Sequence, residues 1–250
     1  MKLDASALTV TGRRPSNEDA ICSRPELGLF VVADGMGGYE GGEVASKLAV
    51  ETIEELVRRT ASGCDVFWPP GSVDLAIGPI EYEVAIATRL ANERIVARRR
   101  GVLAQMGSTV AVLRLHASTG AVLGHVGDSR IYRLRAGGGG VEQLTVDHSL
   151  YAQMVAEGHD PGPDFAYGHV VTRALGTPSG EPEVVKKEIR VGDVYLVCSD
   201  GLSGVLEPAQ IGTLLAVGSA KAACEALVEA ALVAGTRDNV SVIVVRIEGT

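Results

Sequence analysis

Four aspartates of this chain lie where a short apolar segment begins or ends, and each has a glycine or an asparagine beside it. They are Asp34, Asp128, Asp200 and Asp238. Short apolar runs such as residues 28–33 are typical of buried β-strands, and glycine or asparagine next to aspartate is typical of turns. If these strands lie in neighbouring sheets, we expect the four carboxylates to converge at one place.

Converging carboxylates repel one another unless cations neutralise them. Oxygen ligands without histidine or cysteine favour Mg²⁺ or Mn²⁺ over zinc. Gly35 has no side chain, so its carbonyl group can also turn toward a cation. The simpler alternative is that each aspartate only stabilises a turn. That alternative stays open for any one of them, but four such sites together favour binding of divalent cations.

An arginine precedes an acidic pair near the N-terminus, in the segment G-R-R-P-S-N-E-D at residues 12–19. The planar guanidinium group of arginine matches the oxygens of a phosphate. Arg14 lies four and five residues before Glu18 and Asp19, so it could hold a phosphate beside a metal ion. Taken alone, this segment is equally typical of a surface loop.

The pattern along the chain predicts an α+β fold. Helices are expected where apolar residues recur on one helical face, namely at 42–59, 81–100, 208–217 and 220–234, with a short one at 149–157. Strands are expected at 3–10, 28–34, 108–116, 121–126, 130–135, 193–200 and 240–247. Strands joined by hairpins, with helices in pairs, indicate antiparallel sheets covered by helices.

Composition excludes several classes of protein. The chain has 250 residues, 46% hydrophobic and 22% charged, which is typical of a globular protein with a substantial core. A formal net charge of −8 argues against nucleic-acid binding. The N-terminus does not resemble a signal peptide, no apolar run has the length of a membrane helix, and no cysteine pair has C-x-x-C spacing. We expect a cytoplasmic protein that binds neither nucleic acid nor membranes.

Nine segments in order resemble the metal-dependent protein phosphatase family, the type 2C serine/threonine phosphatases, in its bacterial branch. They are R-P-S-N-E-D-A (14–20), V-A-D-G-M-G-G (32–38), G-G-E-V-A-S (41–46), G-S-T (107–109), G-H-V-G-D-S-R-I-Y-R (124–133), L-T-V-D-H-S (144–149), T-R-A-L-G (172–176), C-S-D-G-L-S (198–203) and R-D-N-V-S-V-I-V (237–244).

The resemblance implies a four-layer αββα sandwich, formed by residues 1–250 as a single domain, with a flap at about 148–170 beside the active site. It implies two core Mn²⁺ or Mg²⁺ ions, and a third in a weaker site. The implied ligands are Asp34 bridging two ions, Asp200 and Asp238 on the first ion, Gly35 with Glu18 and Asp19 on the second, and Asp128 with Asp200 on the third.

The implied reaction is hydrolysis of phosphoserine and phosphothreonine by water activated between the cations, with Arg14 binding the phosphate. Asp34 and Arg14 are thus the central catalytic positions. The implied partners are phosphorylated proteins, including a serine/threonine kinase whose action the enzyme opposes. We expect a monomer.

Two positions depart from the family pattern. Many eukaryotic relatives have a histidine at the position of Met36, and that histidine is proposed to protonate the leaving oxygen. Some bacterial relatives have a nearby histidine at the position of Tyr39. Because this chain has neither, we hypothesise that a cation-bound water donates the proton. The end of the flap also differs, with Phe165-Ala-Tyr-Gly-His-Val where bacterial relatives usually read His-Pro-x-Arg-Asn. We expect His116, His125, His159 and His169 to be structural or exposed residues.

Two other functions remain open from the sequence. A catalytically inactive relative that acts as a regulatory binding module should have lost one or more metal ligands, whereas all five aspartates are present here. A general hydrolase of small phosphate esters would have the same metal centre, so only its flap and groove would differ.

Overall fold

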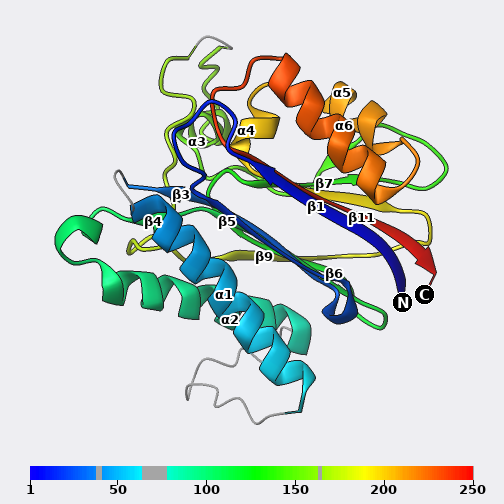
Figure 1. The fold of residues 1–250 in the computed structure, drawn as a ribbon, viewed down its shortest axis with the longest axis horizontal. Coiled ribbons are helices and arrows are strands. Elements are labelled where there is room, and N and C mark those ends of the chain that lie inside the picture. Colours follow the sequence, from blue (N-terminus) through cyan, green and yellow to red (C-terminus); the bar gives the residue numbers. More distant parts are fainter. Residues whose placement is uncertain (38–40, 64–77, 163–164, 250) are drawn as a thin grey trace.

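The structure is a computed structural model that describes residues 1–37, 41–63, 78–162 and 165–249. Two antiparallel sheets lie face to face at its centre (Figure 1). The first sheet has the strand order β1 (Lys2–Val10), β11 (Val240–Gly249), β10 (Val194–Cys198), β7 (Arg130–Leu134) and β8 (Glu142–Gln143). The second has the order β2 (Asp19–Arg24), β3 (Leu29–Met36), β5 (Val110–His116), β6 (Gly120–Val126) and β9 (Glu183–Lys187), and β4 (Gly107–Ser108) pairs with β3.

Helices cover the outer face of each sheet (Figure 1). The second sheet packs against α1 (Gly41–Ala61) and α2 (Pro79–Arg98), and the first against α6 (Ala220–Val233), with α5 (Pro208–Leu215) beside it. The shorter helices are α3 (Leu150–Ala156), α4 (Asp200–Ser203), η1 (Pro25–Leu27) and η2 (Gly101–Leu103). The described residues therefore form the expected αββα sandwich. Within those residues, no helix combines the length and apolar character needed to span a bilayer.

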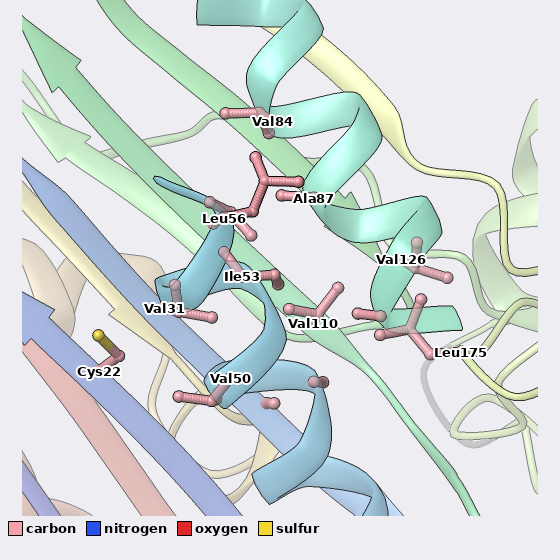
Figure 2. Packing of buried hydrophobic residues seen from close by; sticks show 14 of the residues in the cluster. Cys22, Val31, Val50, Ile53, Leu56, Val84, Ala87, Val110, Val126 and Leu175 are labelled. Atoms are coloured by element: carbon pink, nitrogen blue, oxygen red, sulfur yellow. The ribbon is translucent and has the colours of Figure 1, made fainter. Parts of the chain in front are cut away.

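The alternation of side chains along the central strands explains their continuous apolar runs. On β11, Ile243 and Val245 face the layer between the two sheets, whereas Val242 and Val244 face the layer under α6. Both faces of the strand are thus buried here, so residues 242–245 form a continuous apolar run. A third layer fills the space between the second sheet and its helices (Figure 2), where Ile53 of α1 packs with residues of α2 and of the strands below.

One end of the sandwich gathers the acidic positions. Asp19 begins β2, and its register partner on β3 is Asp34. Asp128 lies in the turn between β6 and β7, Asp200 follows β10, and Asp238 precedes β11. The chain termini lie at the opposite end, where Lys2 pairs with Gly249 (Figure 1).

The structure differs from the expected elements in a few places. The strand expected at 108–116 is divided into β4 and β5, which pair with the same side of β3 in one register, Gly35 with Ser108 and Val32 with Ala111. The strand expected at 193–200 ends at Cys198, and Asp200 instead begins the short helix α4. Strands β2 and β9 were not expected, because their sequences D-A-I-C-S-R and E-V-V-K-K mix polar and apolar residues. Most of the proline-rich segment 63–80, together with Tyr39, lies outside the described residues.

Candidate metal and phosphate site

A cavity of about 480 Å³ opens at the acidic end of the sandwich. Seven of the residues singled out in the sequence line it: Arg14, Glu18, Asp34, Gly35, Asp128, Asp200 and Asp238. Pro15, Ser16, Met36, Gly37, Thr109, His169, Val171 and Asn239 complete the lining. The fold therefore brings together residues that are more than 200 positions apart in the chain.

Asp19 does not line the cavity but lies buried behind Asp34, its cross-strand partner. Its Oδ2 atom accepts hydrogen bonds from Ser199 Oγ at 2.9 Å and from Ser241 Oγ at 2.6 Å. These two hydroxyls come from the ends of β10 and β11, so the first sheet fixes a carboxylate that belongs to the second. Ser199 therefore positions one of the acidic side chains.

Backbone contacts fix the position of Asp34. Its amide donates to Thr109 Oγ1 at 3.1 Å, and its carbonyl accepts from the amide of Thr109 at 2.8 Å. Thr109 Oγ1 is in turn 2.7 Å from Ser129 Oγ, next to Asp128. This chain of contacts links two of the acidic positions. Thr109 belongs to the G-S-T segment, whose role the sequence alone did not reveal.

Three buried carboxylate oxygens have no hydrogen-bond partner among the described residues, and two of them belong to the acidic cluster: Asp19 Oδ1 and Asp200 Oδ1, whereas Glu81 Oε2 lies on α2. A buried acceptor without a donor costs free energy, and a charged one costs more. A divalent cation is the partner that such oxygens fit, because it satisfies several carboxylates at once and offsets their charge. These carboxylate oxygens therefore suit hard divalent cations such as Mg²⁺ and Mn²⁺.

The carboxyl groups of the site also raise one another's pKa values. Burial, followed by the charges of Asp19 and Asp200, raises the pKa of Asp34 well above its ordinary value. Burial and then the charge of Asp200 raise the pKa of Asp128 to about 7. Burial raises the pKa of Asp19 to about 6, although its bonds with the two serines act in the opposite direction. Without cations, burial and mutual repulsion thus disfavour the ionised form of these carboxyl groups in the folded protein.

Glycines give Glu18 its place at the cavity. A Cβ atom on Gly42 would lie 1.9 Å from Glu18 Oε2, and one on Gly35 would lie 2.1 Å from the carbonyl oxygen of Gly42. The carbonyl of Glu18 accepts from the amide of Gly35 at 3.1 Å and from Ser46 Oγ at 2.6 Å. The start of α1 therefore packs directly against the glutamate, and any larger residue there would displace it.

Asn239 holds together the loop that carries Arg14, a role that the sequence analysis missed. Its Nδ2 donates to the carbonyls of Thr11 and Ser16, both at 2.9 Å. Its Oδ1 accepts from the amide of Glu18 at 2.8 Å. The D-N dipeptide in R-D-N-V-S was the only signal in the sequence, and there it indicated a turn.

The guanidinium of Arg14 lies over the cavity and pairs with Asp238, with 2.6 Å between Nη2 and Oδ2. The arginine side chain is 56% exposed, so the pair is accessible from solvent. Arg14 therefore presents its remaining donors at the mouth of the cavity, next to the carboxylates.

A second group of potential ligands, His125, His148 and Glu183, lies beside the β6–β7 turn. The two imidazole rings stack with their centroids 4.5 Å apart. His125 Nε2 is 2.7 Å from the carbonyl of Val146, and Arg173 Nη1 is 3.0 Å from His148 Nε2. A guanidinium so close to the nitrogen opposes a cation there. Since His148 Nδ1 accepts from the amide of Gly127 at 3.1 Å, we interpret the group as support for the turn that carries Asp128.

Comparison with known proteins agrees with this geometry. The sequence profile of the protein phosphatase 2C family matches residues 13–214. The chain belongs to this family. It is 33% identical over 237 residues to the serine/threonine protein phosphatase PstP of Mycobacterium tuberculosis, and the match covers 92% of this chain but only 42% of that relative. The chain thus spans less than half the length of that curated relative.

Two further relatives match over nearly their whole length. The protein phosphatase PhpP of Streptococcus pneumoniae is 28% identical over 97% of both chains. A crystal structure of the catalytic domain of PstP in complex with two manganese ions has 33% identity and a TM-score of 0.81, and the match covers 98% of this chain and 97% of that one.

Proposed function

We propose that this chain is a metal-dependent phosphatase that hydrolyses phosphoserine and phosphothreonine in proteins. The observation that carries the proposal is a cavity lined by Arg14 and Asp200, where Asp200 Oδ1 is buried without a hydrogen-bond partner among the described residues, as is Oδ1 of Asp19, the cross-strand partner of Asp34. Family membership and the two manganese ions in the PstP catalytic domain support the same interpretation.

Mn²⁺ or Mg²⁺ is the proposed cofactor. Asp34, Asp200 and Asp238 are the proposed ligands of one ion, and Asp34 with the carbonyl of Gly35, Glu18 and Asp19 of the other. Asp128 with Asp200 would hold a third. When bound, the cations lower the pKa of water and neutralise charge on phosphate oxygens. Support comes from the pKa values of Asp34 and Asp128, which burial raises first and the charges of neighbouring carboxylates raise further.

The chain's own residues supply position and charge. Arg14 offers a planar set of donors at the mouth of the cavity, which suits two oxygens of one phosphate. Asn239 keeps the Arg14 loop against Asp238. Ser199 and Ser241 hold Asp19 in one orientation, so the acidic cluster is formed before a substrate arrives. No side-chain nucleophile is needed, because the reaction is a direct attack by water.

The proposal also covers the substrates, domain organisation, location and oligomeric state of the enzyme. We infer that its substrates are phosphorylated proteins, among them a serine/threonine kinase whose action it reverses. We further infer that residues 1–250 form one catalytic domain that acts as a cytoplasmic monomer. The long match to PhpP supports the single domain, because that relative has almost the same extent.

An activity assay on two substrates tests the proposal. Purified protein is given a phosphothreonine peptide and 4-nitrophenyl phosphate, with Mn²⁺ and with a chelator. We expect Mn²⁺-dependent release of phosphate from the peptide. No turnover of either substrate, with Mn²⁺ still bound in calorimetry, would favour an inactive binding module. Turnover of the small ester alone would favour a general phosphate-ester hydrolase.

A further inference from the structure

The cavity contains a histidine whose role the sequence did not suggest. His169 was expected to be structural or exposed, and it is exposed, but it also lines the same cavity as Arg14 and the carboxylates. It comes from the last part of the flap, in the segment that departs from the usual bacterial pattern. The flap thus contributes an ionisable side chain to the acidic site.

The backbone around His169 is held close to the metal-site turn. The amide of Leu150 donates to the carbonyl of Val170 at 2.8 Å, and the amide of Thr172 donates to the carbonyl of His148 at 2.8 Å. His148 itself accepts from the amide of Gly127, the residue before Asp128. A short antiparallel bridge, between 149 and 171, therefore connects His169 to the turn that carries a site carboxylate.

The side chain of His169 has no hydrogen-bond partner in the described ranges of the chain. Its ring is therefore available to a substrate, unlike the rings of His125 and His148, which contact the carbonyl of Val146 and the amide of Gly127. His169 and Arg14 come from different loops and line the same cavity, so both are within the space that a phosphorylated substrate would enter.

The other side chains that line the cavity are unsuited to donate a proton to a leaving oxygen near neutral pH. Met36, where many relatives have histidine, has a thioether with no proton to give. Arginine remains charged, and the hydroxyls of Ser16 and Thr109 hold their protons too tightly. The carboxylates are assigned to cations. Histidine is the side chain whose ordinary ionisation range matches this task.

We propose that His169 is the general acid of this phosphatase, which protonates the oxygen of the departing serine or threonine. In this step the bond between phosphorus and the side-chain oxygen breaks while the oxygen of water bonds to phosphorus. The imidazolium gives its proton to the departing oxygen, so serine or threonine leaves as the neutral alcohol. The proton lost by the attacking water passes to solvent, and solvent reprotonates the imidazole. This inference rests on the proposed phosphatase function.

Substrates with different leaving groups distinguish a general acid from a residue that only positions the substrate. An alkoxide such as that of threonine leaves poorly without a proton, whereas 4-nitrophenolate is stable as an anion. In His169→Gln, we expect kcat on a phosphothreonine peptide to fall by about 100-fold or more, with a change of about threefold or less on 4-nitrophenyl phosphate.

His159→Gln is the matched control, because His159 is also an exposed histidine of the flap but does not line the cavity. Its kinetics should equal those of the wild type. Mn²⁺ affinity by calorimetry should be unchanged in both variants, since neither residue is assigned to a cation.

Three results would overturn the proposal. Equal losses on both substrates in His169→Gln would show a positioning role instead. Unchanged kcat on the peptide would favour donation by a cation-bound water. Weaker Mn²⁺ binding in the variant would make His169 a ligand. Wild-type protein that hydrolyses neither substrate is a different outcome, because it contradicts the proposed function itself and removes the basis for this inference.

Discussion

Asp19 on β2 and Asp34 on β3 are cross-strand partners, so two carboxylates face each other at the start of one strand and near the end of the next. Like charges directly opposite each other destabilise a sheet. Burial and the Asp19 charge both raise the pKa of Asp34. This pair does not stabilise the metal-free fold. Its arrangement is explained if the two carboxylates bind cations.

The first prediction concerns stability without cations. Asp128 has a folded-state pKa of about 7, above the ordinary value near 3.8. Between these values the folded state binds more protons than the unfolded state, so stability decreases as pH rises. With chelator present, we expect the free energy of unfolding to be lower at pH 8 than at pH 5.5, by on the order of 3 kcal/mol.

Denaturant unfolding at the two pH values measures this difference. Asp128→Asn should reduce the pH dependence, because it removes one of the groups with a raised pKa. Saturating Mn²⁺ should also reduce it, because a bound cation favours the ionised carboxylates. A metal-free protein that is more stable at pH 8 would contradict the electrostatic account of the site.

The second prediction concerns phosphate binding by Arg14. Arg14→Ala should lower kcat/KM on a phosphothreonine peptide by about 10- to 100-fold, since a charge-assisted hydrogen bond contributes about 1.5–3 kcal/mol. Mn²⁺ affinity should not decrease, because the arginine competes for Asp238. Arg13→Ala is the control: it removes an exposed neighbouring arginine that does not line the cavity. Similar losses in both variants would indicate a general charge effect.

The third prediction concerns the contact between Gly42 and Glu18. Gly42→Ala should weaken Mn²⁺ binding, because the new Cβ atom would lie 1.9 Å from Glu18 Oε2 and force that carboxylate to move. Calorimetry measures the affinity, and circular dichroism checks the fold. Gly212→Ala, in α5, is a matched helical change whose nearest atom lies 3.3 Å away. If the Gly42 variant bound Mn²⁺ as tightly as that control, Glu18 would not be a ligand.

The fourth prediction concerns Asn239. Asn239→Ala removes the partners of three backbone groups, at Thr11, Ser16 and Glu18. Each unsatisfied group costs about 1–3 kcal/mol if it stays buried, so thermal unfolding should occur at a lower temperature. KM for the peptide should rise, because the loop carrying Arg14 loses its attachment. An unchanged KM would show that the loop keeps its position without Asn239.

The sequence predicted the fold well where a strand is buried on both faces. The apolar runs in β3, β10 and β11 were recognised because burial on both faces leaves several consecutive apolar residues in each strand. The edge strand β9 was missed because it has solvent on one side, and its lysines remove the apolar pattern. Strand β2 was missed because its polar positions are satisfied only by contacts across the fold, such as Arg24 with Glu54.

The site was only partly predictable, for a similar reason. The aspartates have a local signature, namely an apolar run with glycine or asparagine beside the acid, and the structure brings them to one cavity, while their role as ligands stays a prediction. His169 has no local signature, and the D-N dipeptide around Asn239 indicates only a turn. Their contributions depend on the approach of the Arg14 loop and of the flap, which only the three-dimensional structure shows.

The most direct test of the account is a calorimetric titration of Mn²⁺ into the metal-free wild type and Asp34→Asn. We predict at least two bound ions per wild-type chain, and binding that is lost or greatly weakened in the variant while circular dichroism shows an intact fold. Wild-type protein that binds no Mn²⁺, or a variant that binds it as tightly and in the same number, would contradict the claim that these carboxylates form a metal centre.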